Sequence, residues 1–252
     1  LEPGRHRQLG ISTYGIWNEE AYQLYMDVMT LKGLLEILDS DSLRAQKVAE
    51  ALEEFTLCVD FEQSRDKRIK SYQEARKILA PLLEAENGST MPLFSCVGNS
   101  HLDLVWLWPK EETIRKTART FGTQLRLLEE YPDYYYIQSQ PACYELCREN
   151  YPQLFERIKQ AVKEGRWVAE GAMWVESDTN MAGGEALIRQ LIYGKRYYRE
   201  MFGVDSRLLW LPDTFGYSAV LPQILKGCGV DYLVTQKIFW SYNEGEDRKS
   251  VV

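Results

Sequence analysis

The chain has 252 residues, 45% of them hydrophobic, and its 30 basic and 37 acidic side chains give a net charge of −7. This size and apolar content suit one large or two modest folded domains and exclude an intrinsically disordered chain. The acidic balance, without a long basic block, excludes nucleic acid and anionic membrane surfaces as expected partners.

The amino-terminal segment gives the first indication of location. Residues 1–10 lack the apolar core of a signal peptide, and no apolar run reaches the roughly 18 residues that span a bilayer. Five scattered cysteines fit reduced thiols, and the only two histidines, His6 and His101, argue against a Cys/His zinc finger. We therefore expect a cytoplasmic protein with no membrane partner. Because the chain begins with Leu1 and not Met, a targeting segment ahead of it stays an open alternative.

Residues 1–90 are predicted to form a helical module. Between Glu19 and Glu86 the apolar residues recur at spacings of three and four, which is the periodicity of amphipathic helices. The polar run 39–42 supplies a break and a new helix N-cap. Asn87-Gly88-Ser89 matches a glycosylation acceptor, but a polar linker is the simpler interpretation, and we place the end of the module there.

From residue 91 onward, short apolar runs alternate with longer amphipathic stretches. The predicted strands are residues 93–97, 134–137, 167–169, 208–211 and 232–234. The predicted helices are residues 113–131, 153–164, 185–202 and 220–228. Repeated strand-then-helix units favour a parallel sheet with right-handed crossovers, as an open sheet or part of a barrel. Residues 91–252 are therefore predicted to form an α/β domain.

Polar and aromatic side chains follow several predicted strands, at the edge where parallel sheets bind ligands. They are His101, Asp103, Trp106 and Trp108 after the first strand, Glu170, Trp174, Glu176 and Asp178 after the third, and Trp210, Asp213 and the turn 215–218 at the fourth. A histidine and an aspartate two residues apart can both point at one ion. Indole faces stack on the apolar C–H patches of a sugar, and carboxylates bind its hydroxyls and perform acid–base chemistry. The set is typical of a sugar site.

Each of these residues also has a structural interpretation. A histidine at a strand end can be a hydrogen-bonded structural residue, and Asp213 can form an Asx-turn or an N-cap. The tryptophans can be core residues, and Glu176 and Asp178 can cap the following helix or interact with its dipole. Spacing alone leaves the function undecided.

Four separated motifs carry a resemblance to a known family. They are Gly98-Asn99-Ser100-His101-Leu102-Asp103-Leu104-Val105-Trp106, Glu170-Gly171-Ala172-Met173-Trp174-Val175-Glu176-Ser177-Asp178, Arg189-Gln190, and Leu211-Pro212-Asp213-Thr214-Phe215-Gly216-Tyr217-Ser218. In this order they resemble the α-mannosidases of glycoside hydrolase family 38, most of all the bacterial and fungal cytosolic branch. The resemblance covers about residues 92–245, and the helical module ahead of them is also seen in that branch.

The resemblance implies a retaining enzyme that uses Zn²⁺ to remove terminal α-linked mannose from oligosaccharides or glycans. Carried over residue by residue, it makes His101 and Asp103 the first two zinc ligands. Asp213 would be both a zinc ligand and the catalytic nucleophile. Trp106 would support the bound mannose, and Asp178 would have a supporting role in substrate binding. The implied fold is α/β, a helical module followed by an incomplete βα barrel-like catalytic domain with a parallel sheet.

The chain departs from the family pattern at its carboxyl end. The family's fourth zinc ligand, a histidine, and its general acid are expected beyond residue 252, and His6 is a poor substitute. We therefore expect this amino-terminal fragment to be inactive with weakened zinc affinity, and the full-length parent to be active. Because family members often assemble, a homo-oligomer is one expectation for the parent. We interpret residues 247–252 as a non-native tail, since one set of codons for them reproduces a common sequencing-adapter stretch.

Two other functions stay open. One is another zinc carbohydrate-active enzyme, such as a polysaccharide deacetylase, in which His and Asp hold a metal that activates water. Such enzymes normally use a second histidine close to the first, and this chain has none there. The other is a non-catalytic carbohydrate-binding domain that keeps the fold without the chemistry. The joint presence of His101, Asp103 and Asp213 counts against that second alternative.

Overall fold

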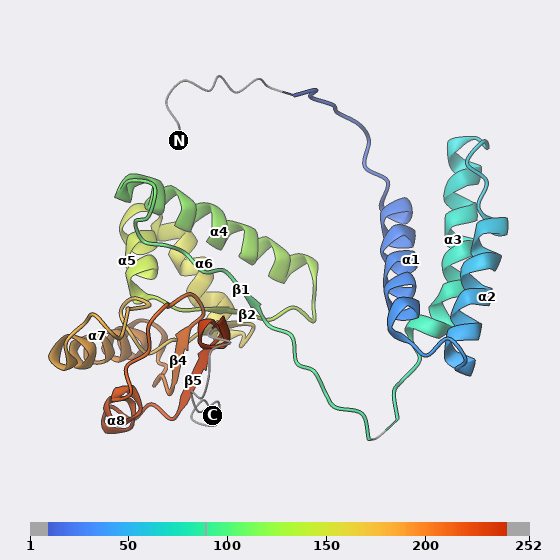
Figure 1. The fold of residues 1–252 in the computed structure, drawn as a ribbon. Helices are drawn as coiled ribbons and strands as arrows, with labels where there is room; N and C mark the ends of the chain where they lie inside the picture. Colours follow the sequence, from blue (N-terminus) through green and yellow to red (C-terminus); the bar gives the residue numbers. More distant parts are fainter. Residues whose placement is uncertain (1–9, 89, 241–252) are drawn as a thin grey trace. The chain divides into compact units, whose positions relative to one another are not determined.

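A computed structural model describes residues 10–88 and 90–240, except for the side chains of residues 239 and 240 (Figure 1). His6 and the predicted non-native tail at 247–252 lie outside the described residues. The chain separates into two compact units, Leu1–Leu93 and Phe94–Val252, which are described in turn. Among the described helices, none is long and apolar enough to cross a membrane.

Within its described residues, the first unit contains three helices. They are α1 (Glu19–Ile37), α2 (Leu43–Cys58) and α3 (Arg65–Leu83). Asn18 and Ser42 cap α1 and α2, because each side chain accepts a hydrogen bond of 3.2 Å from the backbone N–H three residues ahead. Leu31, Val48 and Leu79 are each at most 1% exposed and pack together at the centre. The predicted helical module is confirmed, and the break at residues 39–42 separates α1 from α2.

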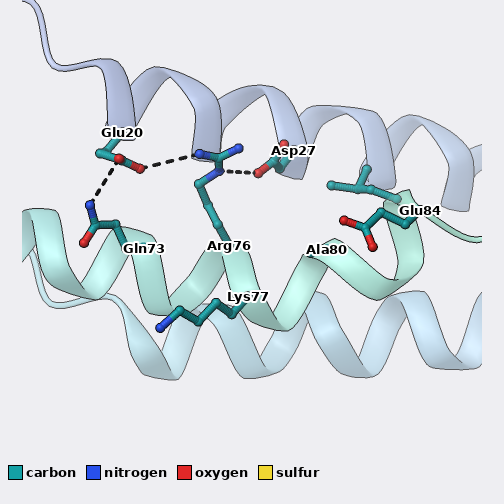
Figure 2. Close-up of a pocket in the computed structure, with 8 residues that line it drawn as sticks. Glu20, Asp27, Gln73, Arg76, Lys77, Ala80 and Glu84 are labelled. Carbon is teal, nitrogen blue, oxygen red and sulfur yellow. Dashed lines mark hydrogen bonds and ion pairs between the residues drawn. The ribbon is translucent and has the colours of Figure 1, made fainter.

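Side chains of α1 and α3 line a hollow of about 510 Å³ (Figure 2). Arg76 on α3 donates from Nε to Oδ2 of Asp27 at 2.8 Å, and its Nη1 lies 3.5 Å from Oε2 of Glu20. Gln73 donates to the other oxygen of Glu20 at 3.1 Å. These groups bind one another across the two helices. Such partly exposed pairs contribute about 0–1 kcal/mol each to stability. Because these side chains bind one another across the two helices, we assign the hollow a structural role in joining α1 to α3.

Up to residue 240, where the description of the chain ends, the second unit contains five short strands and the helices that connect them. The strands are β1 (Gly98–Asn99), β2 (Tyr136–Gln138), β3 (Trp167–Ala169), β4 (Leu208–Leu211) and β5 (Tyr232–Thr235). The helices are α4 (Lys110–Glu130), α5 (Pro141–Asn150), α6 (Pro152–Lys163), α7 (Gly184–Phe202), α8 (Leu221–Gly227) and the 3₁₀ helix η1 (Lys237–Trp240).

The strands form two parallel sheets, β1-β2-β3 and β4-β5, and the strands of each follow chain order. Parallel pairing joins β1 to β2, β2 to β3 and β4 to β5. A parallel bridge between Gly171 and Leu209 links the segment after β3 to β4. At least one helix lies in the chain between each strand and the next. This is the predicted α/β arrangement, and parallel strands in sequence order are how a βα barrel is built.

An aromatic core lies beneath β2 and β3. Trp167 is 1% exposed, and its ring centroid lies 4.7 Å from that of Tyr136 and 5.4 Å from that of Phe121, both edge-on. Cys143 and Cys147 are fully buried in the same cluster as free thiols. These cysteines therefore act as small core residues.

Three elements differ from the prediction: the strand expected at residues 93–97, α5 and the 3₁₀ helix η1, which was not predicted. The strand predicted at residues 93–97 is wrong, since Leu93 and Phe94 are 93% and 83% exposed and β1 begins only at Gly98. An apolar run favours burial, but a strand also needs a paired neighbour, and β2 pairs with residues 98 and 99. The prediction also missed α5, a ten-residue helix with Pro141 at its first position.

Gly194, on α7, lies against the backbone of the segment after β3, and replacing it tests how closely the two pack. A Cβ there would lie 2.1 Å from the carbonyl oxygen of Ala172 and 2.8 Å from the backbone nitrogen of Trp174. Because backbone atoms cannot rotate away, we expect Gly194→Ala to destabilise the second unit by about 1–3 kcal/mol or more. Chemical denaturation followed by circular dichroism measures the change.

Gly122 on α4 is the matched control, because no atom of the described residues, apart from its chain neighbours and the backbone of α4 itself, lies within 4 Å of a Cβ placed there. Gly122→Ala should leave stability unchanged or raise it by up to about 1 kcal/mol, the intrinsic helix preference of alanine. Equal stability of the two variants would contradict the packing described for α7.

Candidate metal centre

Two loops bring three candidate metal ligands together. His101 and Asp103 follow β1, and Asp213 follows β4. Nε2 of His101 lies 3.4 Å from Oδ1 of Asp103 and 3.5 Å from Oδ2 of Asp213. The three ligand atoms all lie within 4.8 Å of one another. These residues converge because the carboxyl ends of parallel strands meet at one edge of the sheet.

The chemistry of this donor set suits a divalent cation. Zn²⁺ accepts imidazole nitrogen and carboxylate oxygen at about 2.0–2.2 Å, and a catalytic zinc site keeps one position open for substrate or water. The three side chains are half-buried, so a small molecule can approach the position between them. The residues therefore fit a metal centre. The same distances also suit a protonated imidazole between two carboxylates.

The other ring nitrogen of His101 faces Glu176, which the sequence placed in the candidate sugar site, with a helix cap or a dipole contact as the alternative. Nδ1 lies 2.5 Å from Oε2 of Glu176, whose side chain is 4% exposed. The hydrogen bond that His101 donates to Glu176 is the main reason that the pKa of His101 rises to about 9, against the opposing effect of burial. The imidazole ring is thus held between a buried carboxylate at Nδ1 and two ligand carboxylates at Nε2.

Ser139 and Gln140, just after β2, support Glu176. The hydroxyl of Ser139 donates to Oε1 of Glu176. The side chain of Gln140 accepts the backbone N–H of Glu176 at 3.2 Å and donates to the carbonyl of Leu102 at 2.8 Å. Gln140 is 3% exposed and adopts a φ of 64°, which is uncommon without glycine. One buried amide therefore ties the His101 loop to the Glu176 loop.

Ser139 and Gln140 were not predicted as site residues from the sequence. Their only signal was their place directly after a predicted strand, the same criterion that selected His101. Small polar residues at that position are common, and neither has the titratable side chain that marks a candidate site. Their role depends on contacts with residues about 37 positions away in the chain.

A lysine contacts the remaining oxygen of Asp213. Nζ of Lys237, on η1, lies 2.8 Å from Oδ1 of Asp213, and the lysine side chain is 11% exposed. The same Nζ lies 5.0 Å from the centroid of the Phe215 ring. The two oxygens of Asp213 therefore face different groups, Oδ1 toward an ammonium and Oδ2 toward the imidazole of His101.

The aromatic candidates divide between surface and core. Trp106, in the loop after β1, is 65% exposed, and its ring meets Trp108 edge-on at 5.8 Å. Trp174 is packed against the buried core, edge-on to Tyr197 at 5.6 Å. The core interpretation therefore holds for Trp174. The contact between Trp106 and mannose stays a prediction.

Asp178 has a structural role in the turn before α7. Its Oδ1 accepts the backbone N–H of Asn180 at 2.7 Å and that of Met181 at 3.0 Å. This is an Asx-type turn, and the expectation that Asp178 caps the following helix is wrong, because the N-cap of α7 is Gly183 and no side chain of the described residues caps it. Its supporting role in substrate binding stays a prediction.

The family assignment follows from a match to the sequence around this centre. The family model for the glycosyl hydrolases family 38 N-terminal domain matches residues 92–250. The chain belongs to glycoside hydrolase family 38. All three candidate ligands of this family 38 chain lie inside the matched region.

Curated relatives extend over nearly the whole chain. The alpha-mannosidase G of Dictyostelium discoideum is 35% identical over 95% of this chain and 22% of its own length. The alpha-mannosidase 2C1 of Homo sapiens is 32% identical over 95% of this chain and 23% of its own length. The family 38 chain therefore spans less than a quarter of the length of these relatives.

A solved structure supports the fold. The crystal structure of an alpha-mannosidase from Enterococcus faecalis V583 matches 55% of this chain and 16% of that chain, with a TM-score of 0.51 and 23% sequence identity. At this identity the likeness shows the fold alone, and it agrees with the α/β architecture of the family 38 chain.

Zinc titration of the 252-residue chain tests the candidate ligands. We expect His101→Ala to weaken zinc binding by more than the roughly 10–100-fold that loss of an outer-shell partner costs, because the variant removes a ligand atom. Isothermal titration calorimetry measures the affinity. His6→Ala, which changes the only other histidine, is the matched control and should bind zinc as the wild type does. Equal affinities in the two variants would contradict ligation by His101.

Proposed function

We propose that the protein to which this chain belongs is a retaining, zinc-dependent α-mannosidase that removes terminal α-linked mannose from oligosaccharides or glycans. Family 38 membership supports the reaction class. The observation that carries the proposal is the convergence of His101, Asp103 and Asp213, whose ligand atoms lie within 4.8 Å of one another. These are the residues that the family resemblance assigns to zinc.

Asp213 is the nucleophile in this proposal. A carboxylate oxygen attacks the anomeric carbon of mannose while the bond to the leaving oxygen breaks and a general acid protonates that oxygen. Water then displaces the carboxylate, and the same acid, now a base, takes the proton from water. Two displacements restore the original configuration. The ammonium of Lys237, 2.8 Å from Oδ1 of Asp213, holds this carboxylate in place during both steps.

His101, Asp103 and Asp213 would hold the Zn²⁺, and Trp106 and Asp178 would contact the sugar. When bound, Zn²⁺ supplies positive charge that binds mannose hydroxyls and orients the ring. Trp106 is exposed enough for its indole face to stack on a pyranose. Asp178 would assist from the turn that its own hydrogen bonds stabilise.

The proposal divides the chain into a helical N-terminal module, residues 1–90, and the amino-terminal part of the catalytic domain, residues 91–252. The fourth zinc ligand and the general acid belong to the protein beyond residue 252, so the isolated chain would be inactive. The parent would act in the cytoplasm, where the free cysteines stay reduced, with a mannose-containing glycan as partner. A homo-oligomer of the parent is part of the same proposal.

The Asp213→Asn variant of the full-length parent tests the proposed function. We expect wild-type parent to hydrolyse an aryl α-mannoside with release of α-mannose, and Asp213→Asn to lose roughly 10⁴-fold or more of that activity. Proton NMR of the first product identifies the anomer. Release of β-mannose, or full activity of Asp213→Asn, would contradict the retaining mechanism.

Two further samples complete this experiment. The isolated 252-residue chain should show no turnover. Asp205→Asn in the parent should remain active, because Asp205 is an exposed residue paired with Arg199. Substantial zinc-dependent turnover by the isolated chain would refute the proposed incompleteness of its site.

A further inference from the structure

We propose that Glu176 is a positioning residue for the metal centre, whose buried carboxylate accepts a hydrogen bond from Nδ1–H of His101 and so leaves Nε2 free to bind the cation. The inference rests on the proposed metal centre and adds a residue to it. Glu176 touches neither the ion nor the sugar in this account. It acts through His101.

The geometry around the imidazole ring supports this role. A neutral imidazole carries one proton, and the hydrogen bond made by one nitrogen decides which nitrogen is available as a ligand. Nδ1 of His101 lies 2.5 Å from Glu176, while Nε2 faces Asp103 and Asp213 at 3.4 and 3.5 Å. An acceptor at Nδ1 therefore selects the tautomer whose Nε2 lone pair points between the two aspartates.

Glu176 is itself fixed on both sides of its carboxylate. With 4% of its side chain exposed, it needs hydrogen bonds in place of water. The hydroxyl of Ser139 binds Oε1, and His101 binds Oε2. Because these bonds come from the loops after β1 and β2, a shift of Glu176 would disturb both loops.

The backbone of the Glu176 loop is also anchored to α7. The N–H of Trp174 donates to the carbonyl of Gln190 at 3.0 Å, and the N–H of Val175 donates to the Gln190 side chain at 3.0 Å. Gln140 accepts the N–H of Glu176 at 3.2 Å. Three consecutive N–H groups are thus held, so the loop can present the carboxylate in one orientation. This rigidity is what a supporting residue of a metal site requires.

Zinc affinity of the 252-residue chain is the first measurement. We expect Glu176→Ala to weaken zinc binding by roughly 10–100-fold, the usual cost of losing an outer-shell partner of a histidine ligand. Glu176→Gln keeps an oxygen that can accept the Nδ1–H bond, so its affinity should lie between those of Glu176→Ala and the wild type.

Glu170→Ala is the matched control. Glu170 is also a partly buried glutamate that accepts a hydrogen bond from a serine hydroxyl, that of Ser206. It lies in the same β3–α7 connection as Glu176. We expect Glu170→Ala to bind zinc with wild-type affinity, whatever it does to stability.

The second measurement reports the tautomer directly. With ¹⁵N-labelled histidine and His6→Ala as background, His101 is the single imidazole in the spectrum. The zinc-loaded wild type should show a slowly exchanging Nδ1–H proton, and Glu176→Ala should lose it. A purely structural role of Glu176 would lower stability without moving this signal.

The outcomes separate the two proposals. If the wild type binds no zinc, the metal centre fails and the role of Glu176 fails with it. If the wild type binds zinc, but Glu176→Ala binds as tightly and keeps the Nδ1–H signal, only the positioning role is overturned. Should Glu176→Ala not fold, Ser139→Ala removes one bond to Glu176 and keeps the carboxylate. Wild-type affinity in both Ser139→Ala and Glu176→Gln would then overturn the positioning role.

Discussion

The parallel alignment of short strands is the constraint on which the candidate site depends. His101 and Asp213 are far apart in the chain, and they meet because β1 and β4 end at the same edge of the second unit. The strands themselves have two to four residues each, so few ladder hydrogen bonds fix that edge. Buried side chains that hydrogen-bond to neighbouring loops also hold the site residues in place. Gln140, which joins the loop after β1 to the loop that carries Glu176, is the clearest case.

The excess of negative charge around His101 favours the binding of a cation. Three carboxylates, those of Asp103, Glu176 and Asp213, lie around one imidazole, and the ammonium of Lys237 balances one of them. The carboxylates of Asp103 and Asp213 each lie within 3.5 Å of Nε2 of His101. Negative charges this close to one another repel strongly where burial lowers the dielectric constant. A protonated His101 compensates a second carboxylate, in line with its raised pKa. If His101 is neutral, two of the three carboxylates remain unbalanced after the contact with Lys237, and a divalent cation would balance both.

The sequence predicted the parts of this arrangement that have a local signal. Helical periodicity identified α1 to α3, and apolar runs identified four of the five strands described in the second unit within about two residues. The strand prediction at residues 93–97 was wrong because the apolar character of a segment does not show whether another strand pairs with it. His101, Asp103 and Asp213 were recognisable by residue type and motif. The contact of His101 with Glu176 spans 75 positions, and Gln140, which joins their two loops, has a positive φ; neither feature has a local signature.

The position of the ion in a zinc-soaked crystal of the chain tests the central claim most directly. Anomalous diffraction at the zinc absorption edge locates the metal without reference to activity. The account predicts one peak at about 2.0–2.2 Å from Nε2 of His101 and from an oxygen of both Asp103 and Asp213, with Glu176 still bound to Nδ1. A peak at Nδ1, or a zinc ion that ligates none of these three residues, would contradict it.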